Sequence, residues 1–213
     1  MDWGRRAVAR AYAAAAAEYT ARFADEFSNV FDSDILQRFF SPLAVGSTVL
    51  DGGCGPGQLA AAAEAQGLNT VGADITIDML AAARDRLYRP RLVCADFCEL
   101  PFSDAAFDAA VCWFSVHNLP RSVTAGLVAE LRRVLVVGGS VLIATHEGDA
   151  EDWFTDDHGE TFAFTYYRDT ELAGLLADAG FTSVATDTRE PLENEHQVKK
   201  LFASAVSTAD ERT

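Results

Sequence analysis

A short glycine-rich segment is the part of the sequence best suited to bind a ligand. It reads Asp51-Gly52-Gly53-Cys54-Gly55-Pro56-Gly57 and follows an apolar run. Its alternate glycines let the backbone turn sharply, and they let a ligand approach the main chain without meeting a Cβ atom. Asp51 can accept hydrogen bonds from a ligand's ammonium group or from the amides of the segment. A plain tight turn is the alternative, and the pattern Gly55-x-Gly57-x-x-Ala60 also fits a dinucleotide fingerprint, so other residues must decide.

Two further carboxylates follow the next two apolar runs. Asp74 follows Val71-Gly72-Ala73, and its place after the glycine segment suits a contact with both hydroxyls of a ribose. Asp96 follows Cys94-Ala95 and can accept from an adenine amino group, while Phe97 can cover the ring. Three acids at the ends of three strands indicate a nucleoside ligand.

The elements that must position these acids alternate between strands and helices. This order predicts a parallel sheet covered on both faces, whose strand ends share one edge. Strands are predicted at 48–51, 70–74, 91–95, 107–114 and 140–145, and helices at 58–66, 78–88 and 122–134.

The two ends of the chain follow a different order. An apolar stripe with spacings of three and four predicts a helix over 5–27, followed by a shorter helix to about Phe40. Segment 147–160 holds seven acids and no Lys or Arg, which favours an exposed insertion, and 162–166 alternates like a short strand. A helix to Ala179 and two strands, 183–188 and 199–206, then predict an antiparallel hairpin at the sheet edge.

Together these motifs resemble the class I S-adenosylmethionine-dependent methyltransferases of the small-molecule type. The resemblance covers residues 47–206, and the N-terminal helices fit that family's cap. The matching segments are Asp51 to Gly57, Val71 to Leu80, Leu92 to Asp96 with Leu100-Pro101-Phe102, Phe107 to Pro120, Leu131 to Ile143, and Glu171 to Phe181.

This resemblance implies a single α/β domain over 1–213. The expected fold is a Rossmann-like, doubly wound, seven-stranded and mostly parallel sheet with an antiparallel C-terminal hairpin and an N-terminal helical cap. The expected parts are the cap (1–46), the cofactor-binding core (47–146), an acidic lid insertion (147–168), and the C-terminal helix with its hairpin (169–213).

The resemblance also assigns roles around S-adenosylmethionine. The Asp51 segment would hold the methionine half, largely through the backbone of Gly53, Cys54 and Gly55, and the two later acids the nucleoside. Plain packing is the alternative for the two tyrosines and for the methionine. The expected cofactor-binding residues are Asp51, Gly53, Cys54 and Gly55 for methionine, Asp74 for ribose, Ile75 and Met79 near adenosine, Asp96 and Phe97 for adenine, Trp113 and Phe114 beside the sulfonium, and Tyr12 and Tyr19 from the cap.

The implied reaction is an in-line methyl transfer to an O- or N-nucleophile of a small molecule, with S-adenosylhomocysteine as product. His117 is the first candidate for a general base, because the ordinary pKa of histidine suits neutral pH, and His146 is the second. Alternatively, His117 positions the cofactor or packs its loop. The alternative functions are a cofactor-binding protein without catalysis and an NAD(P)-binding oxidoreductase, against which Asp51 argues.

The acceptor is expected to be an amine, a phenol or another neutral metabolite, because an acidic lid disfavours anions. Aromatic side chains could line a pocket for a flat acceptor, or simply pack the lid onto the sheet. These are Trp113, Phe114, Trp153, Phe154, Phe162, Phe164, Tyr166 and Tyr167.

Composition narrows the remaining choices. The 213 residues carry a net charge of −15, which disfavours nucleic acid as a partner. No run reaches the roughly 18 apolar residues of a membrane span, so we expect a cytoplasmic protein, monomeric or homodimeric. The four cysteines match no zinc framework, and we expect solvated acids rather than a metal at Asp156-Asp157-His158.

Overall fold

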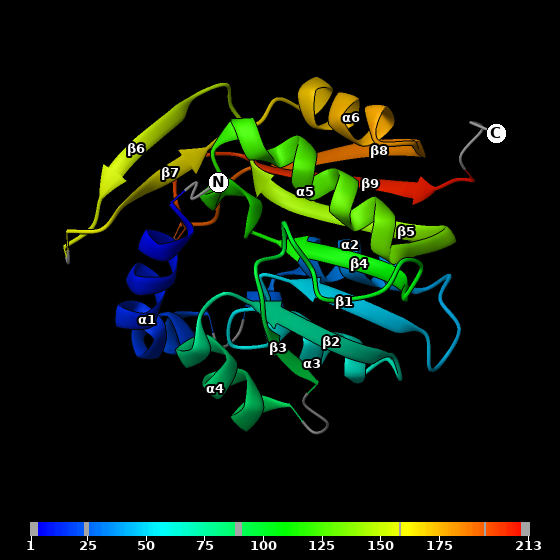
Figure 1. Cartoon of the computed structure of the whole chain (residues 1–213), viewed down its shortest axis with the longest axis horizontal. Helices are drawn as coiled ribbons and strands as arrows, with labels where there is room; N and C mark the ends of the chain where they lie inside the picture. Colours follow the sequence, from blue (N-terminus) through cyan, green and yellow to red (C-terminus); the bar gives the residue numbers. More distant parts are fainter. Residues whose placement is uncertain (1–3, 24–25, 88–90, 158, 194, 210–213) are drawn as a thin grey trace.

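A seven-stranded sheet forms the centre of the molecule (Figure 1). The computed structural model describes residues 4–23, 26–87, 91–157, 159–193 and 195–209. The strand order is β3-β2-β1-β4-β5-β9-β8. The strands are β1 (Thr48–Gly52), β2 (Asn69–Asp74), β3 (Leu92–Cys94), β4 (Phe107–Trp113), β5 (Leu135–His146), β8 (Phe181–Arg189) and β9 (Lys200–Ser207).

The sheet is parallel from β3 through β5, and β9 runs antiparallel to both β5 and β8. This confirms the predicted doubly wound, mostly parallel fold with its C-terminal antiparallel pair. The order reverses between β1 and β4, because the chain first builds outward from β1 to β3 and then returns beside β1. Such a switch point leaves a crevice at the carboxyl ends of the strands, where open α/β sheets bind ligands.

Helices cover both faces of the sheet (Figure 1). Leu127 and Leu131 of α5 (Arg121–Val134) and Leu172 of α6 (Asp169–Asp178) pack on one face. On the other face, Leu36 of α2 and Leu59 of α3 pack against the sheet, and α4 packs beside α3. These three helices are α2 (Val30–Phe40), α3 (Gln58–Glu64) and α4 (Ile77–Arg86).

The first helix is shorter than the sequence pattern predicts. α1 (Arg5–Arg22) ends at Arg22, whereas the prediction continued to residue 27, with 24–25 outside the described residues. Residues Glu26–Ser28 form a separate turn, η1, in which Phe27 packs on Trp113 at 5.2 Å between ring centroids. The helix prediction is therefore wrong at this end, because the last aromatic of the stripe belongs to the core under the sheet.

The acidic segment folds into a β-hairpin. β6 (Glu151–Thr155) pairs antiparallel with β7 (Thr161–Thr165), and every residue of β6 is exposed. Phe162 of β7 packs against Val8 and Ala11 of α1, and Arg10 of α1 forms an ion pair with Glu160. The hairpin thus lies against the first helix (Figure 1). His158, part of the acidic cluster considered for a metal, lies outside the described residues.

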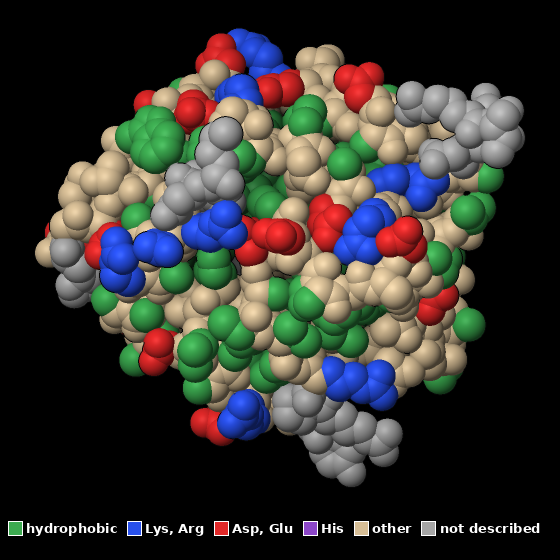
Figure 2. Space-filling view, viewed as in Figure 1, with side chains coloured by type: hydrophobic (Ala, Val, Ile, Leu, Met, Phe, Trp, Pro, Cys, Tyr) green, Lys and Arg blue, Asp and Glu red, His purple; other side chains and the backbone are tan. Residues whose placement is uncertain are grey.

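Within the described ranges, no helix has the length and apolarity needed to cross a membrane. Figure 2 shows acidic and basic side chains interspersed over the visible face, with smaller groups of hydrophobic side chains between them. A cytoplasmic location and the oligomeric state remain predictions.

A buried ion network joins α2 to the C-terminal strands. The Arg189 guanidinium donates two hydrogen bonds of 2.7 Å to the Asp32 carboxylate and two more of 2.7 Å to Glu195. The side chains of Arg189 and Asp32 are only 6% and 2% exposed. Arg38 and Asp187 join the same two elements at 3.4 Å, but both are well exposed.

We predict that Arg189→Met lowers the free energy of unfolding by about 3–5 kcal/mol, because it strands two carboxylates, one of them fully buried. Urea denaturation measures this change. Arg38→Met is the matched control, and its cost should stay below about 1 kcal/mol because water screens that pair. Equal losses in the two variants would show that the buried network does not hold α2 in place.

Candidate functional site

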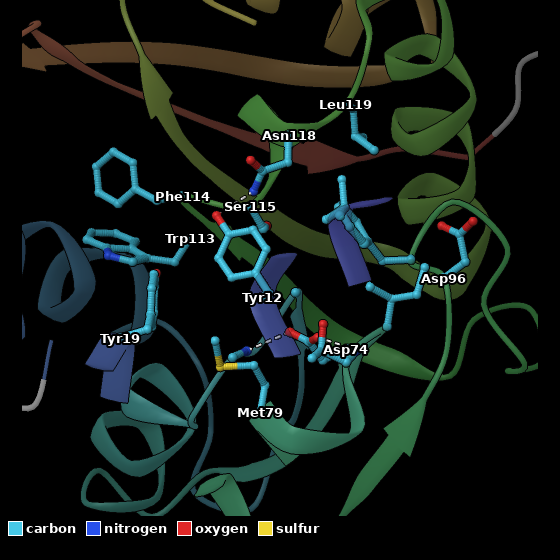
Figure 3. Close-up of a pocket in the computed structure, with 16 residues that line it drawn as sticks. Tyr12, Tyr19, Asp74, Met79, Asp96, Trp113, Phe114, Ser115, Asn118 and Leu119 are labelled. Atoms are coloured by element: carbon cyan, nitrogen blue, oxygen red, sulfur yellow. Dashed lines mark hydrogen bonds between the residues drawn. The ribbon is translucent and has the colours of Figure 1, made fainter. Parts of the chain in front are cut away.

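A pocket lies at the carboxyl ends of β1, β2 and β4 and is closed on one side by α1 (Figure 3). Its free volume is about 60 Å³. Most of the residues expected around a nucleoside line it, and they come from five separate segments. They are Tyr12, Tyr19, Gly53, Gly55, Asp74, Ile75, Met79, Asp96, Phe97, Trp113 and Phe114.

The glycine segment forms the floor of this pocket. Gly53 has a φ of 72°, and a Cβ atom there would lie 2.4 Å from the Cβ of Ser115. Gly55 has a φ of 50°, and a Cβ atom there would meet nothing within 4 Å. The backbone at Gly53 is therefore pressed against the loop after β4, while Gly55 offers its main chain to the open space.

Asp74 ties two loops together beneath the pocket. One carboxylate oxygen accepts from the Gly55 N–H at 2.9 Å, and the other accepts from the Thr76 N–H at 2.8 Å. Burial raises the pKa of Asp74, and these backbone donors oppose that rise. The carboxylate is thus held in place before any ligand contacts it.

Asp96 also lines the pocket. Its Oδ1 accepts from the Cys98 N–H at 2.9 Å, and its Oδ2 lies 3.3 Å from the Arg5 guanidinium at the start of α1. Phe97, beside it, is buried and lines the pocket. The role predicted for Asp96 and Phe97 at adenine stays a prediction.

The turn after β4 closes the pocket on a third side. Phe114 has a φ of 46°, a left-handed conformation that is rare outside glycine and stores local strain. Ser115 next to it donates from Oγ to the Gly52 carbonyl at 2.8 Å. This bond fixes the loop after β4 to the end of β1, and it holds the Trp113 and Phe114 rings beside the glycine floor.

Two tyrosines of α1 reach across the pocket. Tyr12 points into the space between Asn118 and Asp74, and its hydroxyl accepts from Asn118 Nδ2 at 2.9 Å (Figure 3). Tyr19 packs edge-on against it at 5.7 Å. Burial raises the pKa of Tyr12, so its hydroxyl stays neutral.

Two residues predicted for the methionine half do not line the pocket. Asp51 is 1% exposed and Cys54 is 5% exposed, and both lie beneath the loop. Burial raises the pKa of the Cys54 thiol, and the charges of Asp51 and Asp74 raise it further. The roles predicted for Asp51 and Cys54 stay predictions, whereas the Cys54 thiol is neutral and buried here.

The two candidate bases lie behind the pocket wall. His117 belongs to the short turn η2 (Val116–Asn118), and His146 ends β5; their rings are 4.8 Å apart. Neither histidine lines the pocket. Asn118, which follows His117 in the sequence, does line it, and so does Phe114, whose ring lies near that of His146. Their predicted catalytic roles stay predictions.

Five lining residues have no counterpart in the sequence analysis. Two of the five could have been proposed from the sequence, because Ser115 and Asn118 stand inside the Phe107–Pro120 motif and carry polar groups. The others are a helix N-cap and aliphatic residues, whose position depends on packing. The five are Val8, Thr76, Ser115, Asn118 and Leu119.

These residues fit an adenosine-type cofactor with a charged tail. Asp74 and Asp96 offer acceptor oxygens to hydroxyl and amino groups, and Gly55 leaves open backbone where a larger residue would stand. The free volume is well below the ~300–1,000 Å³ of typical ligand sites. A nucleoside therefore requires the side chains that line the pocket to shift.

Comparison with known proteins agrees with this geometry. Residues 49–139 match the family model described as "Methyltransferase domain". The chain is 40% identical over 111 residues to a demethylmenaquinone methyltransferase of Clavibacter sepedonicus, a match covering 50% of this chain and 43% of the relative. It is 32% identical over 147 residues to a malonyl-[acyl-carrier protein] O-methyltransferase of Pectobacterium atrosepticum, covering 68% of this chain and 54% of the relative. The chain spans about half the length of these relatives.

Among solved structures, the fold is similar to the 1,6-didemethyltoxoflavin-N1-methyltransferase of Burkholderia thailandensis, solved with 1,6-didemethyltoxoflavin and S-adenosylhomocysteine. The TM-score is 0.74 at 20% identity, and the match covers 96% of this chain and 88% of the other. The fold is thus Rossmann-like, and residues 49–139 match a methyltransferase domain. These matches agree with the resemblance of the sequence motifs to the class I S-adenosylmethionine-dependent methyltransferases.

The glycine floor yields a stability prediction. Gly53→Ala should lower the free energy of unfolding by about 1–3 kcal/mol, because alanine is strained at positive φ and its methyl group would overlap Ser115. Urea denaturation measures the change, with Gly126→Ala in α5 as the control. No atom lies near the Cβ position of Gly126, and helix propensity should make that variant stabler by about 0.5–1 kcal/mol. A Gly53→Ala variant as stable as the parent would contradict this close approach.

Proposed function

We propose that this protein transfers a methyl group from S-adenosylmethionine to a small-molecule acceptor. One observation carries the proposal. The Asp74 and Asp96 carboxylates and the open glycine backbone line one pocket at the switch point between β1 and β4. Acceptor oxygens from two side chains in one pocket suit a nucleoside, and the motif pattern suits this cofactor.

In this proposal each wall of the pocket has one task. Asp74 binds the ribose hydroxyls, with Ile75 and Met79 against the nucleoside. Asp96 and Phe97 bind adenine, which requires Arg5 to share or release the Asp96 carboxylate. The charged end is held by the backbone of Gly53 and Gly55 and by the rings of Trp113, Phe114, Tyr12 and Tyr19, which line the pocket. Asp51 by its charge and Cys54 by its backbone act from beneath the lining.

The bound cofactor supplies a methyl group activated by a positively charged sulfur. The chain's own contribution is alignment, which can supply up to about 7–11 kcal/mol in favourable systems. Trp113 and Phe114 exclude water from the reacting end, and aromatic faces stabilise a nearby cation. Strain at Phe114 indicates a ring held in one orientation by the surrounding fold.

The acceptor we propose is a small molecule with an oxygen or nitrogen nucleophile. A neighbour in fold was solved with a small heterocycle bound, which supports this class of acceptor. If a proton must leave the acceptor, His117 is the proposed base and His146 the second candidate. Burial lowers the pKa of His117 to about 3 and that of His146 to about 2, so both imidazoles are neutral and can accept a hydrogen bond.

Asp74→Asn tests the cofactor site. We predict that this variant binds S-adenosylmethionine and S-adenosylhomocysteine about 10- to 100-fold more weakly, because a charge-assisted bond worth roughly 1.5–3 kcal/mol is lost. Isothermal titration calorimetry measures both affinities. Asp78→Asn, an exposed carboxylate on α4, is the matched control and should bind both ligands as the parent does.

Calorimetry with NADH separates the alternatives. The unaltered protein should bind the two sulfur-containing ligands and no NADH. Binding of NADH alone would overturn the proposed cofactor. Binding of both sulfur ligands, with no turnover on any amine, phenol or heterocycle tested, would instead indicate a cofactor-binding protein.

The predicted cap role of α1 has its own test. S-adenosylhomocysteine should slow amide hydrogen exchange in α1 by at least about tenfold at saturation, because ligand bound under the helix penalises its opening. Mass spectrometry of peptides covers α1, with α6 on the far side of the sheet as the control. Protection confined to the glycine segment and the β2–α4 turn would show that α1 does not close over the ligand.

A further inference from the structure

A cluster of rings lies beside the pocket and is not used by the cofactor site. His117 and Phe164 are 4.6 Å apart between ring centroids, and His146 lies 4.8 Å from His117 and 5.1 Å from Phe164. Tyr166 and His196 continue the cluster outward, joined by a hydrogen bond of 3.0 Å between the tyrosine hydroxyl and Nε2. Four segments distant in sequence supply these rings: η2, the end of β5, β7 with the residue that follows it, and the β8–β9 connection.

The cluster adjoins the cofactor pocket directly. Phe114 lines the pocket and also lies 5.4 Å from the His146 ring. Asn118, next to His117, lines it as well. The cluster therefore stands at the carboxyl ends of β4 and β5, on the ligand-binding edge of the sheet. From there it leads to the surface, where His196 is exposed.

Both buried imidazoles carry a polar atom that the fold does not use. His117 is 7% exposed and His146 is 6% exposed. Among the described residues, neither Nδ1 atom has a hydrogen-bond partner. Buried polar side-chain atoms in folded proteins usually have partners, because an unsatisfied one is costly. Two such atoms on neighbouring rings at the ligand edge indicate an external partner.

Charged groups of the C-terminal strands lie near the cluster. The charged groups that act on His117 and His146 are Lys200 of β9 and Arg189 of β8, both cations. Arg189 pairs with both Asp32 and Glu195 at 2.7 Å, and Glu195 also lies 3.6 Å from Lys200, so these cations and acids neutralise one another. Asp152 of β6 acts only on Tyr166, at the outer end.

The chemistry of these groups defines the partner. Aromatic rings at tilted and edge-on angles form contacts with another flat ring. A neutral imidazole nitrogen hydrogen-bonds a neutral hydroxyl well, while an unpaired ammonium or carboxylate would be costly in this buried place. Nearby cations also stabilise negative charge that develops on a hydroxyl oxygen.

We infer that this cluster binds the methyl acceptor, and that the acceptor is an uncharged aromatic compound whose hydroxyl group meets His117 and His146. The inference rests on the proposed function. Methyl transfer to that hydroxyl forms an oxygen–carbon bond and breaks the carbon–sulfur bond, whose electron pair stays on sulfur. The hydroxyl proton leaves to a histidine ring nitrogen or to water.

Equilibrium binding of model acceptors tests this inference without turnover. The unaltered protein is saturated with S-adenosylhomocysteine and titrated in a calorimeter with 4-nitrophenol, 4-nitroanisole or benzylamine, at about pH 5.5 so that 4-nitrophenol is uncharged. We expect 4-nitrophenol to bind at least about tenfold more tightly than 4-nitroanisole, which lacks the hydroxyl proton, and more tightly than benzylamine, which is a cation. Equal binding of nitrophenol and nitroanisole, or tighter binding of benzylamine, would overturn the inference.

Substitutions in the ring cluster test whether these residues cause the preference for 4-nitrophenol over 4-nitroanisole. His117→Phe and His146→Phe keep a ring but remove its nitrogens, so each should lose most of the discrimination between nitrophenol and nitroanisole. His117→Asn keeps a polar atom near the position of Nδ1 and should retain part of it. Thr145→Val is the matched control, because Thr145 also has a buried Oγ1 without a partner among the described residues but lies on the other face of β5. Loss in the Thr145 variant, or none in the phenylalanine variants, would place the site elsewhere.

The same titrations separate the two proposals. S-adenosylhomocysteine affinity is measured first for every protein, and unchanged affinity shows that a variant is folded. Failure of the unaltered protein to bind S-adenosylhomocysteine would count against the proposed function. Normal S-adenosylhomocysteine binding without a preference for nitrophenol would count against the aromatic hydroxyl alone.

Discussion

The Asp74 carboxylate joins two loops of the binding edge, and the shape of the pocket depends on that bridge. Its two oxygens accept from the Gly55 and Thr76 amides, which belong to the turns after β1 and β2. Without the carboxylate, each of these two backbone N–H groups would lose its hydrogen-bond acceptor, which is costly where the backbone is buried. The same carboxylate is thus both a brace for the apo structure and the proposed ribose ligand, so structural and binding roles coincide in one side chain.

A second set of contacts makes the floor of the pocket stiffer than its cover. Gly53 packs against Ser115, whose hydroxyl is bonded to the Gly52 carbonyl, so the ends of β1 and β4 are fixed to each other. On the opposite side, α1 reaches the pocket through side chains, including the Tyr12–Asn118 bond and the Arg5–Asp96 ion pair. Side-chain contacts of this kind open at lower cost than strand pairing.

The sequence predicts that Asp74 and Asp96 lie near the glycine segment, because a parallel sheet brings the carboxyl ends of separate strands to one edge. Asp74, Asp96 and the glycine segment therefore fall into one pocket as expected. Spacing could not show that α1 ends at Arg22, because Phe27 fits a helical stripe yet packs on Trp113. Nor could it show the ring cluster, since His117, His146 and Phe164 meet only through tertiary packing. The sequence also did not reveal β6 as a strand. Its acidic residues indicate that the segment is exposed, but they do not indicate whether it pairs with another strand.

The small volume of the pocket limits how a ligand can enter and leave the site. Because the free volume is about 60 Å³, a nucleoside fits only molecules in which the side chains around the pocket have moved apart. The affinity measured in bulk is then the intrinsic affinity multiplied by the fraction of molecules in that open state. A spent ligand departs by the same route, so the frequency of this opening sets an upper limit on how often the site can be emptied and refilled.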